Sequence, residues 1–198
     1  MEFAEVVKKR RAVRDFTSAG IERPEIEALI NTAIEAPSAM NLQPWAFAVV
    51  LDRSRVDDYA RRAKEWLLAN PSRFPFTADA RRMLEEPRFT IFYHAPALLL
   101  VLARSSEAQA VEDCCLAAEN LMLAARERGL GTCWIGFARP WLNLPETKAE
   151  LGLPQQYEVV APIVLGHPVA WPESHGRKPA ETYWIRPERE QRPVAVAS

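Results

Sequence analysis

The spacing of apolar residues predicts three long helices. In "PEIEALINTAIEA" the apolar positions keep one side of a helix buried over residues 24–36. A second amphipathic helix is predicted over 55–69, before the helix-ending pair "NP". Residues 107–128 are apolar on nearly every side through "CCLAAENLMLAA". That pattern is typical of a helix buried in the domain centre or at a subunit interface, and Gly129 is placed to end it.

Four apolar runs have the length of strands. The first, "WAFAVVL" at 45–51, is interpreted as a strand buried on both faces. The others are "ALLLVLA" at 97–103, "GTCWIGF" at 131–137 and "YEVVAPIVLG" at 157–166. Helices and strands therefore alternate along the chain, which indicates one α/β or α+β sandwich with helices packed on a sheet. No linker divides the chain, so residues 1–198 are expected to form a single domain.

Two segments do not fit this alternation. Residues 71–94 mix prolines, aromatic residues and charge without a clean period, so they are interpreted as a surface excursion and a candidate lid. The tail, 167–198, is rich in proline and charge yet contains the strand-like run "TYWI". This run has no evident partner in the domain's own core, and we expect the tail to embrace another subunit.

Charge and hydropathy exclude two classes of partner. The 198 residues carry 25 Lys and Arg against 26 Asp and Glu, a net charge of -1, which gives no global support to nucleic-acid binding. The longest apolar runs are about half the roughly 20 residues that a membrane-spanning helix needs. The charged start "MEFAEVVKKRR" lacks the apolar region of a secretory signal. A cytoplasmic location is therefore expected.

Cysteine and histidine spacing does not predict a metal site. Cys114, Cys115 and Cys133 include no CxxC pair, and the three histidines lack zinc-site spacing with them. Reduced core thiols are expected, and no metal. "GLGTCWIG" leaves a helix and opens a strand, which is the reverse of a dinucleotide-binding fingerprint. The markers of a serine hydrolase and of a P-loop are also absent from the sequence.

Two basic clusters lie far apart in the sequence. Arg10, Arg11 and Arg14 stand together in "RRAVRDF", and Arg177 and Lys178 form a pair in "HGRKP". Taken alone, the first cluster fits a solvated helix end that favours the negative pole of the helix. The functional alternative is that both clusters surround one phosphate, where arginine supplies bidentate hydrogen bonds and lysine a point charge.

A polar segment precedes the first strand. "PSAMNLQPW" places Ser38, Asn41 and Gln43 beside two prolines that hold the backbone extended. Amide groups offer a donor and an acceptor together, the mixture that a flavin's pyrimidine edge requires. The same string also fits an ordinary turn with Asx-type hydrogen bonds.

Read together, these motifs resemble the nitroreductase family of flavoproteins. The likeness runs over most of the chain, in the order "RRAVRDF", "APSAMNLQPWAF", "APALLLV", "AAENLMLAARERGLGTCWIGF", "VLGHP" and "GRKP". The resemblance implies an α+β homodimer whose central mixed sheet is flanked by helices. It also implies FMN bound at the subunit interface, with NADH or NADPH as co-substrate.

The resemblance assigns roles by matching motifs. Those implied to surround the FMN phosphate are Arg10, Arg11, Arg177 and Lys178. Arg14 would lie near flavin N1 and O2, and Ile135 and Gly136 would present backbone to N5. Those implied to contact the ring from the other subunit are Pro37, Ser38, Ala39 and Asn41. Ala12 stands where the family commonly has Ser, and Arg88 is a candidate for a ring-binding residue that the sequence does not otherwise supply.

The implied activity is hydride transfer from NAD(P)H through flavin N5 to a small aromatic or conjugated oxidant, by a ping-pong mechanism. Nitroaromatics, quinones and enones all fit this description. Aromatic candidates for the substrate pocket are Phe74, Tyr93, His94 and Trp141. Two alternatives stay open: a non-catalytic FMN-binding or storage protein, and another flavin chemistry on the same fold, such as dehalogenation or flavin fragmentation.

Overall fold

A four-stranded sheet with the strand order β1-β2-β4-β3 forms the centre of the protein. The computed structural model describes residues 1–73 and 77–185. The strands run over Trp45–Val50 (β1), Ala97–Ala103 (β2), Gly131–Trp134 (β3) and Glu158–Gly166 (β4). Each strand lies within a range that the apolar pattern predicts.

The three long helices are also confirmed, as α2, α3 and α5. The α-helices of the described residues are α1 (Phe3–Lys9), α2 (Arg23–Ala33), α3 (Arg53–Ala69), α4 (Ala78–Glu85), α5 (Ala108–Glu127), α6 (Arg139–Leu142) and α7 (Pro145–Glu150). Short 3-10 helices cover Ala39–Asn41, Pro71–Arg73 and Gly136–Ala138. Gly129 ends α5 as expected, with a φ of 78° that disfavours any residue with a Cβ. Among the described residues, no helix is long and apolar enough to cross a membrane.

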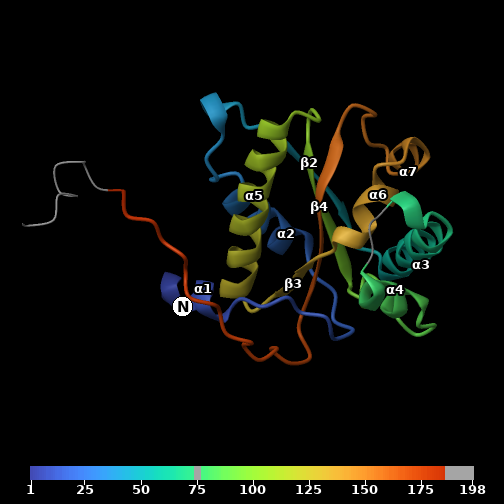
Figure 1. The fold of residues 1–198 in the computed structure, drawn as a ribbon, viewed down its shortest axis with the longest axis horizontal. Coiled ribbons are helices and arrows are strands. Elements are labelled where there is room, and N and C mark those ends of the chain that lie inside the picture. Colours follow the sequence, from blue (N-terminus) through green and yellow to red (C-terminus); the bar gives the residue numbers. More distant parts are fainter. Residues whose placement is uncertain (74–76, 186–198) are drawn as a thin grey trace, which may run out of the picture.

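Helices cover both faces of the sheet, which gives three layers (Figure 1). Every residue of β2 is buried. Its odd-numbered residues, such as Leu99, pack in one core with α2 and α5. Its even-numbered residues, such as Leu100, pack in a second core with α3 and α6. The continuous apolar run of β2 follows from this burial on both sides.

The strands pair antiparallel throughout, so the expectation of a mixed sheet is wrong for the described strands. The parallel pairing is reduced to one isolated bridge between Ala12 and Thr132. Connection length does not dictate this direction, because residues 51–96 between β1 and β2 and residues 135–157 between β3 and β4 are each long enough for a parallel crossover. β3 lies at the second edge of this sheet, beside β4.

The first strand is an edge strand, which corrects the expectation that it is buried on both faces. Of its six residues, Trp45 alone is buried, and Val49 is exposed. β1 pairs with β2 on one side, and no strand of the described residues pairs with its other side. An unpaired apolar edge of this kind is a template for another strand.

Residues 10–16, here called the N-terminal arm, lie against β3. The Val13 N–H donates to the Thr132 carbonyl at 2.9 Å, and Phe16 bridges to Pro168. Gly131 makes this approach possible, because a Cβ there would lie 2.7 Å from Val13 Cγ2. The arm therefore depends on the absence of a side chain at this point of β3.

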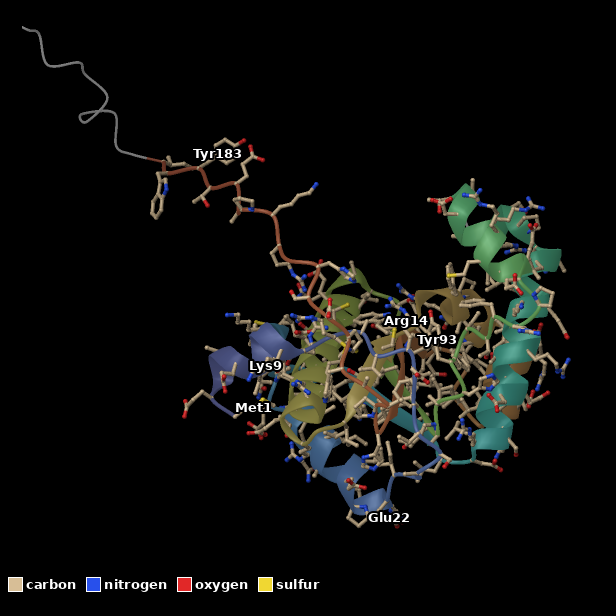
Figure 2. All side chains as sticks on the ribbon, turned by 90° about the horizontal axis from the view of Figure 1, so that it is seen from below. Met1, Lys9, Arg14, Glu22, Tyr93 and Tyr183 are labelled. Atoms are coloured by element: carbon tan, nitrogen blue, oxygen red, sulfur yellow. The ribbon has the colours of Figure 1, made fainter. Side chains whose placement is uncertain are left out.

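After β4 the tail first returns to the arm and then leaves the body of the protein. The Thr17 N–H donates to the His167 carbonyl and the Val169 N–H to the Asp15 carbonyl. Farther on, the tail extends away, as Figure 2 shows for Tyr183. Tyr183, Trp184 and Ile185 are 79%, 83% and 96% exposed. "TYWI" forms no strand within the described residues, and 186–198 lie outside them.

Candidate functional site

A cavity of about 470 Å³ lies between the N-terminal arm, the end of β3 and the loop that follows α4. We call it the Arg14 cavity. Its lining residues are Arg14, Met83, Phe89, Ile91, Tyr93, Cys133, Trp134, Ile135, Gly136 and Phe137. Four residues that the sequence analysis selects thus meet here, although they come from three separate parts of the chain.

Arg14 provides the positive charge of this cavity. It is the one charged residue among the described lining residues, and its guanidinium carbon lies 5.9 Å from the centre of the Tyr93 ring. Figure 2 shows the two side chains next to each other. Burial raises the pKa of the Tyr93 phenol and of the Cys133 thiol, so both are neutral at pH 7. The cavity is an apolar slot with a single cation, suited to a flat ligand that carries or develops negative charge.

The backbone at Ile135 and Gly136 offers one free donor. The Ile135 N–H donates to the Pro162 carbonyl at 2.7 Å, and the Ile135 carbonyl accepts from Ala138. Ile135 is therefore not available as the backbone donor that the resemblance implies. In the described structure the Gly136 N–H has no acceptor, and nothing lies within 4 Å of where a Gly136 Cβ would stand. Gly136 is thus open to a ligand on this side.

Arg10 and Arg11 lie where the arm leaves α1. Arg11 donates from its guanidinium to the carbonyls of Lys8 and Arg10, at 2.7 and 2.6 Å. Arg10 Nε lies 3.3 Å from Glu119 Oε1, an ion pair that lacks the geometry of a hydrogen bond. Arg11 therefore contacts the carbonyl end of α1, as the alternative interpretation predicts, although Arg10 and Arg11 are partly buried and only Arg14 of the cluster is exposed.

Residues 37–43 form a locally bonded loop. Ser38 Oγ accepts from the Gln43 N–H, and Gln43 Nε2 donates to Asn41 Oδ1, each at 3.0 Å. Met40, Asn41 and Gln43 have positive φ, which is uncommon outside glycine. The turn predicted as the alternative interpretation is therefore present. None of residues 37–41 lines the Arg14 cavity of the same chain.

Asp113, a residue that sequence reasoning missed, fixes this loop. Its carboxylate is only 3% exposed and accepts from the Ala39 N–H with both oxygens, each at 3.2 Å. The sequence signal that could have identified Asp113 is an acidic residue within an apolar helix, because a buried carboxylate requires hydrogen-bond donors. α5 thereby holds the loop from its first turns.

Replacing Asp113 by Ala is expected to lower the free energy of unfolding by about 1–3 kcal/mol, because the Ala39 N–H loses a charged acceptor. Because the family resemblance implies that this loop contacts FMN, we also expect weaker FMN binding when the loop loses its anchor. Urea unfolding and FMN titration measure the two effects. Glu112→Ala, at the exposed neighbouring residue, is the control. Equal stability of D113A and E112A would contradict this role for Asp113.

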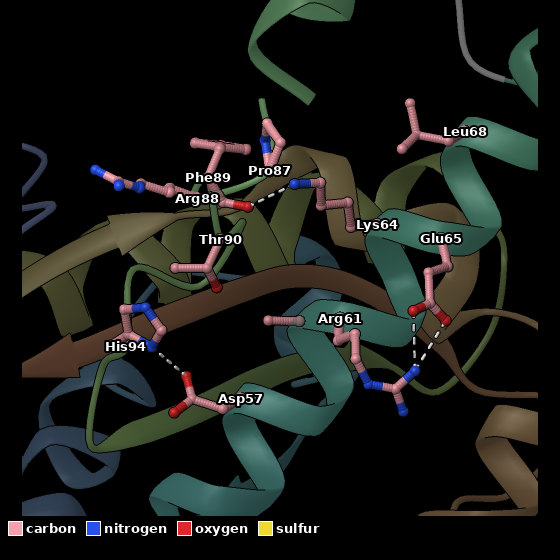
Figure 3. Close-up of a pocket in the computed structure, with 11 residues that line it drawn as sticks. Asp57, Arg61, Lys64, Glu65, Leu68, Pro87, Arg88, Phe89, Thr90 and His94 are labelled. Atoms are coloured by element: carbon pink, nitrogen blue, oxygen red, sulfur yellow. Dashed lines mark hydrogen bonds and ion pairs between the residues drawn. The ribbon is translucent and has the colours of Figure 1, made fainter. Parts of the chain in front are cut away.

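A second cavity, of about 350 Å³, lies between α3 and the loop at 87–94 (Figure 3). His94 belongs here and not to the Arg14 cavity, because its Nδ1 lies 2.8 Å from Asp57 Oδ1 of α3. Arg88 also lines this second cavity, so it is not placed to bind a ligand ring beside Arg14. Lys64 donates to the carbonyls of Glu86 and Phe89. These contacts tie residues 86–94 to α3.

The remaining predicted residues lie elsewhere. Trp141 is 4% exposed and packs on Tyr59 in the core, with ring centres 5.8 Å apart, so its selection as a substrate contact is corrected. Phe74 lies outside the described residues. Arg177 and Lys178 are on the exposed tail, and the Arg177 guanidinium donates to the Gly176 carbonyl.

Comparison with known proteins identifies the family to which this chain belongs. The nitroreductase family profile matches residues 7–167. The chain belongs to the nitroreductase family. It is 32% identical over 174 residues to an iodotyrosine deiodinase of Thermotoga neapolitana, covering 83% of this chain and 87% of that protein. It is 30% identical over 196 residues to a 4-nitrobenzoate reductase of Pseudomonas putida, covering 84% and 85%.

The fold of this nitroreductase-family chain is also found in a solved structure. A nitroreductase with bound FMN from Bacteroides fragilis superposes with a TM-score of 0.80 at 26% identity, covering 94% of this chain and 100% of that one. The resemblance noted in the sequence, the α+β fold and the enzyme class of FMN-dependent oxidoreductase are thereby confirmed.

Proposed function

We propose that this member of the nitroreductase family is a homodimeric oxidoreductase that uses NAD(P)H and FMN to reduce a small aromatic or conjugated compound. The observation that carries the proposal is the Arg14 cavity, an apolar slot with one cation and one free backbone donor. A nitroaromatic, a quinone or an enone would suit such a slot, because each is flat and apolar and accepts electrons.

The residues present fit FMN. The cavity walls are apolar and aromatic, as a flavin ring requires, and Arg14 is the cation near which its pyrimidine edge would lie. Arg10 and Arg11 are at the other end of the same arm, each with a buried Nε that has no hydrogen-bond partner in the described structure. A phosphate group there would supply the missing acceptors.

A second subunit would complete the site. The loop at 37–41 does not line the Arg14 cavity of its own chain, so we propose that it contacts the FMN held by the partner. The unpaired edge of β1 and the exposed "TYWI" run support the same arrangement, since each lacks an apolar or strand partner within the described chain. The tail would lie on the other subunit and bring Arg177 and Lys178 toward a phosphate.

Bound FMN would supply the redox chemistry, taking electrons from NAD(P)H and passing them to the oxidant. Arg14 would stabilise negative charge that develops on the ring's pyrimidine edge. The Gly136 N–H would orient the ring by donating to it from the end of β3. Phe89 and Tyr93, whose rings meet edge to face at 5.8 Å, would exclude water from one wall.

The first test is the visible spectrum of the protein after saturation with FMN and removal of the excess. We expect a flavin spectrum that persists, bleaches under anaerobic NADH or NADPH, and returns when a nitroaromatic or a quinone is added. Loss of the flavin during removal would contradict the site. Retention without bleaching would favour the FMN-binding or storage protein instead. Light scattering of the same sample measures whether it is a dimer.

A further inference from the structure

Three guanidinium groups have a buried Nε without a hydrogen-bond partner. Among the described residues, these belong to Arg10, Arg11 and Arg126. Arg10 has Glu119 nearby, whereas neither Arg11 nor Arg126 has a carboxylate within ion-pair distance in the described chain. A partly buried cation without a counter-charge is costly, so an anion is expected beside the last two.

Arg126 stands in the last turn of α5, close to the arm. Burial and the charge of Arg11 both lower the pKa of Arg126, which indicates that the two guanidinium groups share one region. The arm's bridge from Ala12 to Thr132 brings Arg11 toward the end of α5, since the chain turns from α5 into β3 at Gly129 and Leu130. Two like charges held together in this way would repel each other unless an anion lies between them.

Trp171 fixes the Arg126 side chain. The guanidinium carbon lies 3.5 Å from the centre of the Trp171 ring, a close stacking contact. Trp171 is itself held by the tail, which is bonded to the arm two residues earlier through Val169 and Asp15. The stack orients the planar guanidinium but adds no negative charge, and arginine retains its donors when its face is covered.

We propose that Arg126, held in place by Trp171, binds the phosphate of the flavin nucleotide together with Arg11. This rests on the proposed function, because it takes FMN as the ligand. A phosphate monoester carries up to two negative charges and several acceptor oxygens, so it would satisfy both unpaired cations with charge-assisted hydrogen bonds. Arg128, two residues farther on, is exposed and lies 3.7 Å from Glu127, so it is not part of this pair.

The test compares two ligands that differ only in the phosphate. FMN and riboflavin are titrated into the flavin-free full-length protein, and their dissociation constants are read from the quenching of flavin fluorescence. In R126M we expect the FMN affinity to fall by about 10- to 100-fold, the loss of one or two charged hydrogen bonds, with riboflavin affinity unchanged within about twofold. R128M removes a positive charge from the same end of α5 and should change neither the FMN affinity nor the riboflavin affinity.

Two further variants separate phosphate binding from tail anchoring. R126K keeps a point charge and should recover part of the FMN affinity, whereas W171L should lose part of it and leave riboflavin binding unchanged. Inorganic phosphate should compete with FMN in the wild type and compete less in R126M. Equal weakening of both ligands in R126M would overturn the proposal, because it would show that the stack only anchors the tail. Unchanged FMN affinity would also overturn it.

The same titration distinguishes this proposal from the proposed function. If the wild-type protein bound neither FMN nor riboflavin, the flavin site itself would be wrong. If the wild type preferred FMN over riboflavin and R126M kept that preference in full, the site would stand and only the role of Arg126 would fail.

Discussion

Replacing Arg14 by Met is expected to slow the bleaching of bound flavin by NADH or NADPH by about 10²- to 10³-fold, the usual effect of removing one group that stabilises developing charge. Arg14 is the one cation of its cavity among the described lining residues, so no neighbour there replaces it. FMN binding should weaken much less, because the apolar walls and the arginines proposed to bind the phosphate are unchanged. Anaerobic stopped-flow absorbance measures the rate.

Arg14→Lys is the matched control for this prediction. It keeps the positive charge but loses the guanidinium fork, so we expect its rate to lie between those of the wild type and R14M. An R14M protein that bleaches at the wild-type rate would show that negative charge does not develop beside residue 14.

Replacing Gly131 by Ala is expected to lower the free energy of unfolding by about 1–3 kcal/mol and to weaken FMN binding at the same time. A Cβ at this position would lie within 2.9 Å of three atoms of Val13, including its Cβ. A change of rotamer cannot relieve that overlap, because the Val13 Cβ does not move with the side-chain torsion. The arm would have to leave β3, together with the arginines on either side of Val13.

Urea unfolding and FMN titration measure these two effects on one preparation. Gly20→Ala is the matched control, since nothing lies within 4 Å of a Cβ at residue 20 and its φ is not positive. Loss of stability in G131A with unchanged FMN affinity would contradict the link between the docked arm and the cofactor.

The elements of the fold were predictable from the sequence because they depend on local patterns. The apolar run of β2 and the helical spacing of α2 are each patterns among residues that are close in the sequence and belong to one element. The placing of β1 at the edge was not predictable in this way. Its run is as apolar as that of β2, and its exposure depends on which strands flank it in the sheet. The antiparallel pairing likewise depends on how the strands are arranged in the sheet and not on a pattern within one element.

The candidate site was predictable in part. Arg14 and Gly136 could be selected because they belong to motifs whose order resembles the nitroreductase family. Trp141 was selected for its residue type alone, and only the packing shows that it belongs to the core. That Ile135 cannot serve as a backbone donor could be known only from the sheet register, since its N–H already donates to the Pro162 carbonyl. Arg126 looks like an ordinary surface arginine until the tail places Trp171 over it.

The docking of the arm on β3 and the tail has a consequence for synthesis of the chain. Residues 10–16 are synthesised more than a hundred residues before their partners Thr132 and Pro168. Contacts so distant in sequence close late in folding, because the intervening chain must first be ordered. The basic arm therefore stays undocked while the intervening residues are translated, and a cofactor that needs the docked arm can be captured only after Pro168 has been synthesised.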